Sequence, residues 1–169
     1  MITKEHANFP RAGFLRRLGA MLYDALLAVA VYTFFGAIGV GIFTLMVHSG
    51  LISFGEHQHI ADLLNGTPLY HGIYQVYLFV CVAFFYAIFW HKGGQTLGMR
   101  AWRLKVQHPN GQTLGMITSL ARVFWSALGA SNLFILFSAD KRALQDKMTQ
   151  SEVVVLSKEA NQMRNWHGA

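Results

Sequence analysis

The sequence predicts an all-α membrane protein with two full transmembrane helices, a third helical segment that either re-enters or spans, and a small cytoplasmic β-hairpin. Two uncharged apolar runs are long enough to cross a bilayer, and the basic residues fall into separate segments beside them. Charged residues make up only 13% of the 169 positions, about half of the ~25% found in soluble proteins. The low charge implies that lipid, rather than water, covers much of one membrane domain.

The first apolar run covers 25–47 and is interrupted only by Tyr32, Thr33 and Thr44. As a helix it would measure ~34 Å, which exceeds the ~30 Å hydrocarbon core of a bilayer. A cleaved signal peptide has an apolar stretch of only ~7–15 residues before a small-residue cleavage site. We therefore predict a membrane span at about 18–47.

The second apolar run covers 72–90 and contains no charged residue. Its 19 residues would form a helix of ~28 Å, close to the thickness of the hydrocarbon core. Aromatic side chains near both ends are typical of interfacial belts: Tyr70, Tyr74 and Tyr77 at one end, Phe89 and Trp90 at the other. This run is predicted to be the second span.

The third apolar run covers 117–137 and differs from the other two in carrying an arginine, Arg122. A small, polar break at 129–132 divides it. The run either spans the bilayer with the arginine near an interface, or dips in and returns as a re-entrant hairpin. Both alternatives stay open.

The distribution of lysine and arginine predicts the orientation. The 48–71 connection has none, whereas the other three segments outside the runs hold thirteen of the fourteen: Lys4, Arg11, Arg16, Arg17; Lys92, Arg100, Arg103, Lys105; Lys141, Arg142, Lys147, Lys158, Arg164. By the positive-inside rule both termini and the 91–116 connection are cytoplasmic and the 48–71 loop is extracytoplasmic. Three simple crossings would place the basic C-terminal segment outside, against this rule. The rule therefore favours a third segment that returns to the cytoplasmic side.

Short soluble elements are predicted beside the runs. Residues 102–106 alternate between apolar and polar, and the turn-forming 108–111 follows, which indicates a β-hairpin that ends near Leu114. Residues 151–156 are a candidate third strand. A short interfacial helix is expected around His59–Leu64, and 157–169 are expected to form a flexible tail.

Asp24 is the most informative single residue, because it opens the first apolar run. Arg17 lies seven positions earlier, which places both side chains on one face of a helix about 10 Å apart. A carboxylate within the bilayer needs a partner, and Arg122 is a candidate. Such a group serves either as an ion or proton relay or substrate contact, or as a structural ion pair that fixes helix packing.

Three motifs resemble those of the RDD family of bacterial membrane proteins, named for one arginine and two aspartates. They are Arg17–Asp24 in the first span, the glycine-rich 94–98 segment, and 141–146 followed by 151–154. The resemblance covers a membrane domain at 9–156. It implies that Arg17, Asp24 and Asp146 are signature residues, with Arg122 fitting a further arginine, and that the protein lies in a bacterial inner membrane.

This sequence departs from the family pattern at two positions. Met99 stands after the glycine-rich motif, where the family often has a lysine, and Gln145 stands before the last aspartate, where it often has histidine. A proton relay through that histidine is therefore not implied here.

Other site chemistries find little support. The glycine-rich segment, with Gly94, Thr96 and Gly98, lacks the Gly-Lys-Ser/Thr ending of a phosphate loop and is expected to form a turn. In the outer loop Glu56, His57 and His59 are weak candidates for zinc ligands. We expect no enzyme, no cofactor and no nucleic-acid partner, because the sequence contains no nucleophilic set and its basic residues are split among three segments.

Two functions follow as alternatives. In the first, the protein is transport-related, and Arg17, Asp24, Asp146 and Arg122 form a buried polar cluster used by an ion or small solute. In the second, it is a non-catalytic accessory or assembly subunit of a membrane complex. Two or three helices enclose little interior, so either function is expected to involve a homo-oligomer or a membrane protein partner.

Overall fold

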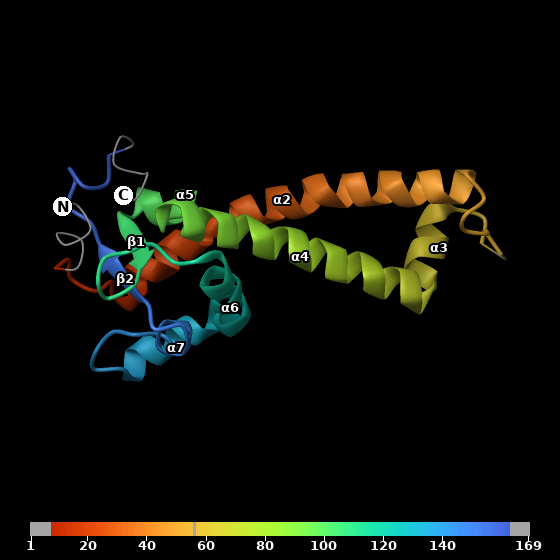
Figure 1. Ribbon diagram of the computed structural model, residues 1–169. Helices are drawn as coiled ribbons and strands as arrows, with labels where there is room; N and C mark the ends of the chain where they lie inside the picture. Colours follow the sequence, from red (N-terminus) through yellow and green to blue (C-terminus); the bar gives the residue numbers. More distant parts are fainter. Residues whose placement is uncertain (1–7, 56, 163–169) are drawn as a thin grey trace. The chain divides into compact units, whose positions relative to one another are not determined.

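Both predicted spans are confirmed as long helices. The computed structural model describes residues 8–55 and 57–162. Helix α2 covers Phe14–His48 and helix α4 covers Pro68–Gly93 (Figure 1), and both are long and apolar enough to cross a membrane. Each helix extends a few residues beyond the predicted bounds, because the apolar run marks only the part of a helix that lipid can cover.

The chain divides into two compact units. The second unit, residues 28–82, contains the central and C-terminal part of α2, the start of α4 and the short helix α3, Ile60–Gly66. Helix α3 confirms the helix predicted around 59–64 in the 48–71 connection. An apolar cluster holds this unit together: Phe43, Val47, Leu63 and Leu64.

Tyrosines and glycines bring α2 and α4 together within the second unit. The Tyr74 hydroxyl donates to the Gly36 carbonyl at 3.0 Å, and the Tyr77 hydroxyl donates to the Phe35 carbonyl at 3.2 Å. A Cβ atom on Gly39 would lie 2.8 Å from the Tyr77 ring. The missing side chains of Gly36 and Gly39 on α2 thus leave room for the tyrosine rings of α4.

The first unit comprises residues 1–27 and 83–169, of which 8–27 and 83–162 are described. Besides the ends of α2 and α4 it contains six short elements (Figure 1): α5 Leu97–Ala101, β1 Leu104–Gln107, α6 Met116–Ser126, the 3₁₀ helix η1 Ala127–Phe137, α7 Leu144–Met148 and β2 Glu152–Val155.

The small sheet is confirmed, but its pairing differs from the expected hairpin. Strand β1 pairs antiparallel with β2, from Leu104 opposite Val155 to Gln107 opposite Glu152. The turn at 108–111 forms, since the His108 amide donates to the Gln112 carbonyl at 2.8 Å, yet the segment up to Leu114 forms no strand in the described structure. Alternation predicts a strand but does not select its partner, and the β-branched β2 is the better one.

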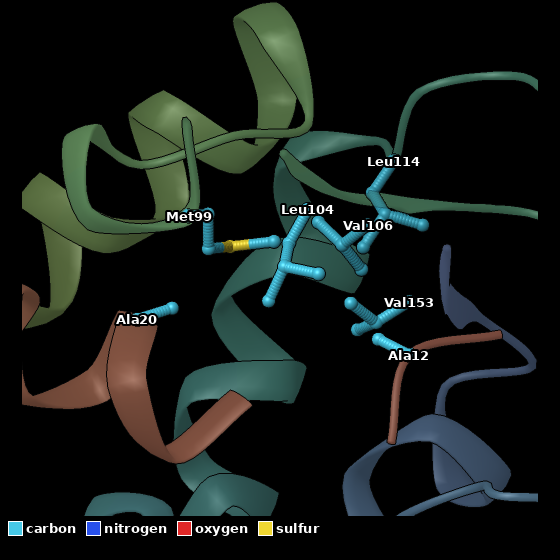
Figure 2. Packing of buried hydrophobic residues seen from close by; sticks show 7 residues of the cluster. All are labelled: Ala12, Ala20, Met99, Leu104, Val106, Leu114 and Val153. Carbon is cyan, nitrogen blue, oxygen red and sulfur yellow. The ribbon is translucent and has the colours of Figure 1, made fainter. Parts of the chain in front are cut away.

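A buried apolar cluster lies around this sheet (Figure 2). Leu104, Val106 and Val153 point toward one another, and Met99 reaches toward Leu104 from α5. The segment before α2 joins the cluster through Ala12, whose amide donates to the Val153 carbonyl at 2.8 Å. The sheet therefore ties the start of the first long helix to the end of the chain.

The third apolar run is broken rather than straight. Helix α6 and residues 129–137 bend by 77° relative to one another. Length and composition allow either a broken span or a re-entrant loop. Past β2, residues 158–162 form a turn, and the Asn161 side chain donates to the Arg100 carbonyl at 3.1 Å. The rest of the expected tail, 163–169, lies outside the described residues.

Candidate functional site

Three of the four predicted signature residues meet in one ion-pair triad: Arg17, Asp146 and Arg122. Arg17 donates through Nη1 to Oδ2 of Asp146 at 2.7 Å, and Arg122 donates through Nη2 to Oδ1 at 2.6 Å. The guanidinium groups come from α2 and α6, and the carboxylate comes from α7. Each carboxylate oxygen therefore has its own arginine, and three helices are joined at one point.

Further hydrogen bonds hold the triad in place. Oδ2 of Asp146 also accepts from the Ala143 amide at 3.0 Å, which caps the start of α7. Arg122 donates through Nη1 to the Ser151 hydroxyl at 2.5 Å, and its guanidinium lies 5.4 Å from the centre of the Trp90 ring. Arg17 donates through Nη2 to the Lys141 carbonyl at 3.1 Å.

The triad is closed to solvent. Asp146 is 0% exposed, and the two arginines are 4% and 3% exposed. Burial alone would raise the pKa of the Asp146 carboxyl, but the charges of Arg122 and Arg17, together with the hydrogen bonds from Ala143 and Arg122, outweigh burial and lower this pKa below its ordinary value. The carboxylate therefore stays ionised, and its two salt bridges satisfy it within the chain.

Asp24 lies in a second site, on the glycine-rich segment. Its Oδ2 accepts from the Thr96 hydroxyl at 2.5 Å, and its Oδ1 accepts from the Gly98 amide at 2.9 Å. The residue is 6% exposed, and Tyr86 donates to its backbone carbonyl at 3.1 Å. Both donors to the carboxylate are neutral.

The glycine-rich segment is shaped to receive this carboxylate. Gly94 follows the end of α4 with φ +68, a conformation that favours glycine. Thr96 then caps α5 by accepting the Met99 amide at 3.1 Å. A Cβ atom on Gly98 would lie 2.6 Å from Oδ1 of Asp24, so only glycine allows this approach. The segment bends at Gly94, continues into α5 at Leu97, and contacts Asp24 through Thr96 and Gly98.

The expected pairing of Asp24 with Arg122 is wrong, and the four signature residues do not form one cluster. Arg122 binds Asp146 instead, and Asp24 makes no salt bridge within residues 8–55 and 57–162. Arg17 and Asp24 share a helix, but each binds a different segment of the chain. The reason is geometric: α7 supplies a carboxylate to the arginines, and the glycine-rich segment supplies neutral donors to Asp24.

Sequence reasoning missed several polar contacts around these sites. Gln145, which replaces the family's frequent histidine, accepts from the Ser131 hydroxyl and donates to Asn132 Oδ1 at 3.0 Å. Ser151 was assigned only to a strand. The polar residues at 129–132 were a sequence signal for the contacts of Gln145 with Ser131 and Asn132. No sequence feature near Ser151 indicates its hydrogen bond with Arg122.

The weak zinc candidates are not supported as a site. Glu56 lies outside the described residues, and His57 and His59 lie in the segment between α2 and α3. Within the described ranges, no group of three or more histidine, cysteine, aspartate or glutamate side chains is placed to hold a metal ion.

Comparison with protein-family models matches the RDD family over residues 11–150. The matched range contains the Arg17–Asp146–Arg122 triad, Asp24 and the glycine-rich segment. No match was found among curated proteins or among solved structures. The resemblance drawn from the three motifs is therefore confirmed at the level of the family.

Proposed function

Because the chain belongs to the RDD family, we propose that it is a transport-related membrane protein in which Asp24 takes up a proton or another small cation. The triad has a different role in this proposal: it fixes the fold around the site. No catalytic step and no cofactor are part of the proposal.

The observation that carries the proposal is the chemistry of the partners of Asp24. Asp24 directly precedes the apolar run 25–47, and a carboxylate that enters hydrocarbon is costly, so such groups are usually paired or functional. Asp24 accepts from a hydroxyl and a backbone amide, which do not neutralise its charge. A proton or bound cation would supply the missing positive charge without breaking an ion pair.

The topology we propose follows the basic residues. The 48–71 connection carries no lysine or arginine, whereas the segments flanking the other helix ends do. We therefore place both termini in the cytoplasm and the 48–71 loop outside a bacterial inner membrane. Two long helices enclose little interior, so a transport path is proposed to need a homo-oligomer or a membrane protein partner.

The experiment is proton flux into proteoliposomes that contain an entrapped pH-sensitive dye, driven by a potassium diffusion potential. We expect Asp24→Asn to abolish flux through the reconstituted protein, because an amide cannot carry a proton at neutral pH. Asp62→Asn is the matched control, since Asp62 is an exposed aspartate on α3. Unchanged flux in Asp24→Asn would remove Asp24 from the mechanism.

An accessory or assembly subunit is the second candidate. The observation that favours it is the triad, whose carboxylate is satisfied entirely by groups of the same chain and is closed to solvent. Purification in mild detergent separates the two candidates. A stoichiometric partner protein supports the accessory role, whereas a homogeneous homo-oligomer that conducts protons after reconstitution supports transport.

A further inference from the structure

Helix α6 buries its polar face and exposes its apolar face, the opposite of a surface helix in a soluble protein. Its polar residues Ser119 and Arg122, three positions apart, are 0% and 3% exposed. Ile117 and Phe124, seven positions apart and on one face, are 84% and 71% exposed. In water the apolar face of a surface helix turns inward, so the orientation of α6 requires an apolar environment outside it.

The 3₁₀ helix η1 repeats this arrangement. Its polar residues Ser131 and Asn132 are buried against Gln145 of α7. Its exposed side chains are large and apolar: Leu133, Phe134, Leu136 and Phe137. The six exposed apolar residues of α6 and η1 are here together named the outer apolar surface: Ile117, Phe124, Leu133, Phe134, Leu136 and Phe137.

Both ends of the α6–η1 segment are attached to the same core of the first unit. Before α6, Leu114 is part of the apolar cluster around the sheet, and its carbonyl lies 2.9 Å from Nδ1 of His91. After η1, the Lys141 carbonyl accepts from Arg17, and the Ala143 amide donates to Asp146. Arg122, inside α6, binds that same Asp146. Ends held at one small core cannot lie on opposite sides of a ~30 Å hydrocarbon layer.

We propose that the α6–η1 segment enters one leaflet and returns, and that acyl chains of anionic phospholipid cover its outer apolar surface. The exposed Lys141 and Lys147 lie four and ten positions after Phe137 and provide the charge complementarity to anionic headgroups. The same chain contains two helices that are long and apolar enough to cross a membrane. Lipid is therefore the apolar medium that would surround α6 and η1. A second copy of the chain is the competing occupant.

The first test determines on which side the two ends of the segment lie. Cys81 is the only cysteine, so Cys81→Ser gives a background for single cysteines at three exposed positions: Gln112→Cys, Ala139→Cys and Ser53→Cys. A membrane-impermeant maleimide is applied to spheroplasts and to inverted vesicles. Gln112→Cys and Ala139→Cys should react from one side and the outer-loop control Ser53→Cys from the other. Reaction of Gln112→Cys and Ala139→Cys from opposite sides would show a full span and overturn the proposal.

The second test identifies what covers the surface. A fluorophore is attached at Phe124→Cys or Phe137→Cys in nanodiscs that contain brominated phosphatidylglycerol. Quenching should approach that of a label at Phe34→Cys in α2, while a label at Asn110→Cys in the exposed turn should stay bright. Energy transfer between labelled copies without lipid quenching would identify a second copy as the occupant and refute lipid.

The headgroup contribution has its own readout in the same system. Replacing the brominated phosphatidylglycerol with phosphatidylcholine brominated at the same acyl position should reduce the quenching at Phe137→Cys. The double variant Lys141→Gln, Lys147→Gln should make that quenching independent of lipid charge. Equal quenching in both lipids without the double substitution would refute the anionic preference. None of these readouts requires flux, so a failure of the transport proposal leaves them interpretable.

Discussion

Asp146 and Asp24 are both buried carboxylates of the first unit, yet their partners differ in charge. Two guanidinium groups bind Asp146, whereas a hydroxyl and an amide bind Asp24. The Asp146 site carries two positive charges against one negative, and the Asp24 site has no cation among the described residues. The comparison shows that a buried aspartate in this unit is satisfied in two ways: Asp146 by two charged arginines, and Asp24 by a neutral hydroxyl and a backbone amide.

The helix that carries both Arg17 and Asp24 contributes one residue to each site. Arg17 connects α2 to α7, and Asp24 connects α2 to the glycine-rich segment after α4. The two sites therefore attach α2 to two different segments of the chain, through residues that lie seven positions apart on the helix.

The largest effect is expected from Asp146→Asn. The substitution leaves two buried guanidinium groups without a counter-charge, and breaking a buried ion pair in this way costs about 3–5 kcal/mol. Thermal unfolding in detergent should show a large loss of stability. Asp140→Asn, an exposed aspartate in the same region, should leave the unfolding temperature nearly unchanged. Equal behaviour of the two variants would mean that the triad contributes no stability.

Gly98→Ala should produce the next largest effect, at the other aspartate. The new Cβ would lie 2.5 Å from the Ala20 carbonyl oxygen and 2.6 Å from Oδ1 of Asp24. Relieving such overpacking costs about 1–3 kcal/mol. Gly13→Ala is the control, because its Cβ would meet no atom within 4 Å. A Gly98→Ala protein as stable as Gly13→Ala would show that the close approach is not required.

Thr96→Val should have a smaller effect. The hydroxyl donates to Asp24 and accepts from the Met99 amide, so its loss removes a hydrogen bond and a helix cap worth about 1–2 kcal/mol together. Thr96→Ser retains the hydroxyl and should restore stability. If valine and serine behave alike in thermal unfolding, the hydroxyl plays no part in holding Asp24.

The smallest effect on stability is expected from lowering the pH moderately, because the Asp146 carboxyl stays ionised in this range. The pKa of Asp146 is lowered in the folded state, so its contribution is fully present above the unfolded-state pKa of about 3.9. This contribution is lost only as the pH falls through the still lower folded-state pKa. Between pH 7 and 4.5 the triad should therefore contribute no change in stability.

Arg122→Gln should shift that acid loss to higher pH. With one guanidinium fewer, the burial that raises the pKa of Asp146 is opposed by less positive charge. Unfolding curves at several pH values compare this variant with Arg16→Gln, which removes an exposed arginine next to Arg17. The same pH profile in both variants would contradict the pairing of Arg122 with Asp146.

Local patterns predicted the two long helices and both strands of the sheet, but not the short helices α5 and α7 or the pairing of the strands. The apolar runs predicted α2 and α4 because length and composition alone decide whether a helix can cross lipid. Alternation predicted β1, and the 151–156 segment contains β2. The partner of a strand depends on tertiary packing. For this reason β1 pairs with the distant β2 and not with the segment that follows it in the chain.

The same limit explains the candidate site. The family resemblance pointed to Arg17, Asp24 and Asp146, but it carried no information on which side chains touch. Arg122 was assigned to Asp24 because the two were the intramembrane charges of opposite sign. The assignment failed because Asp146, outside the apolar runs, lies against both arginines in three dimensions. The glycine-rich motif was interpreted from its backbone alone, and its contact with a carboxylate was therefore missed.

The separation of Arg17 and Asp146 by 129 positions has a consequence for biosynthesis. At ~5–20 residues per second, the ribosome delivers the carboxylate on the order of ten seconds after the arginine. Until Asp146 has left the ribosome, the guanidinium of Arg17 lacks the carboxylate that binds it in the folded protein. The triad therefore forms only after about six sevenths of the 169 residues have been synthesised.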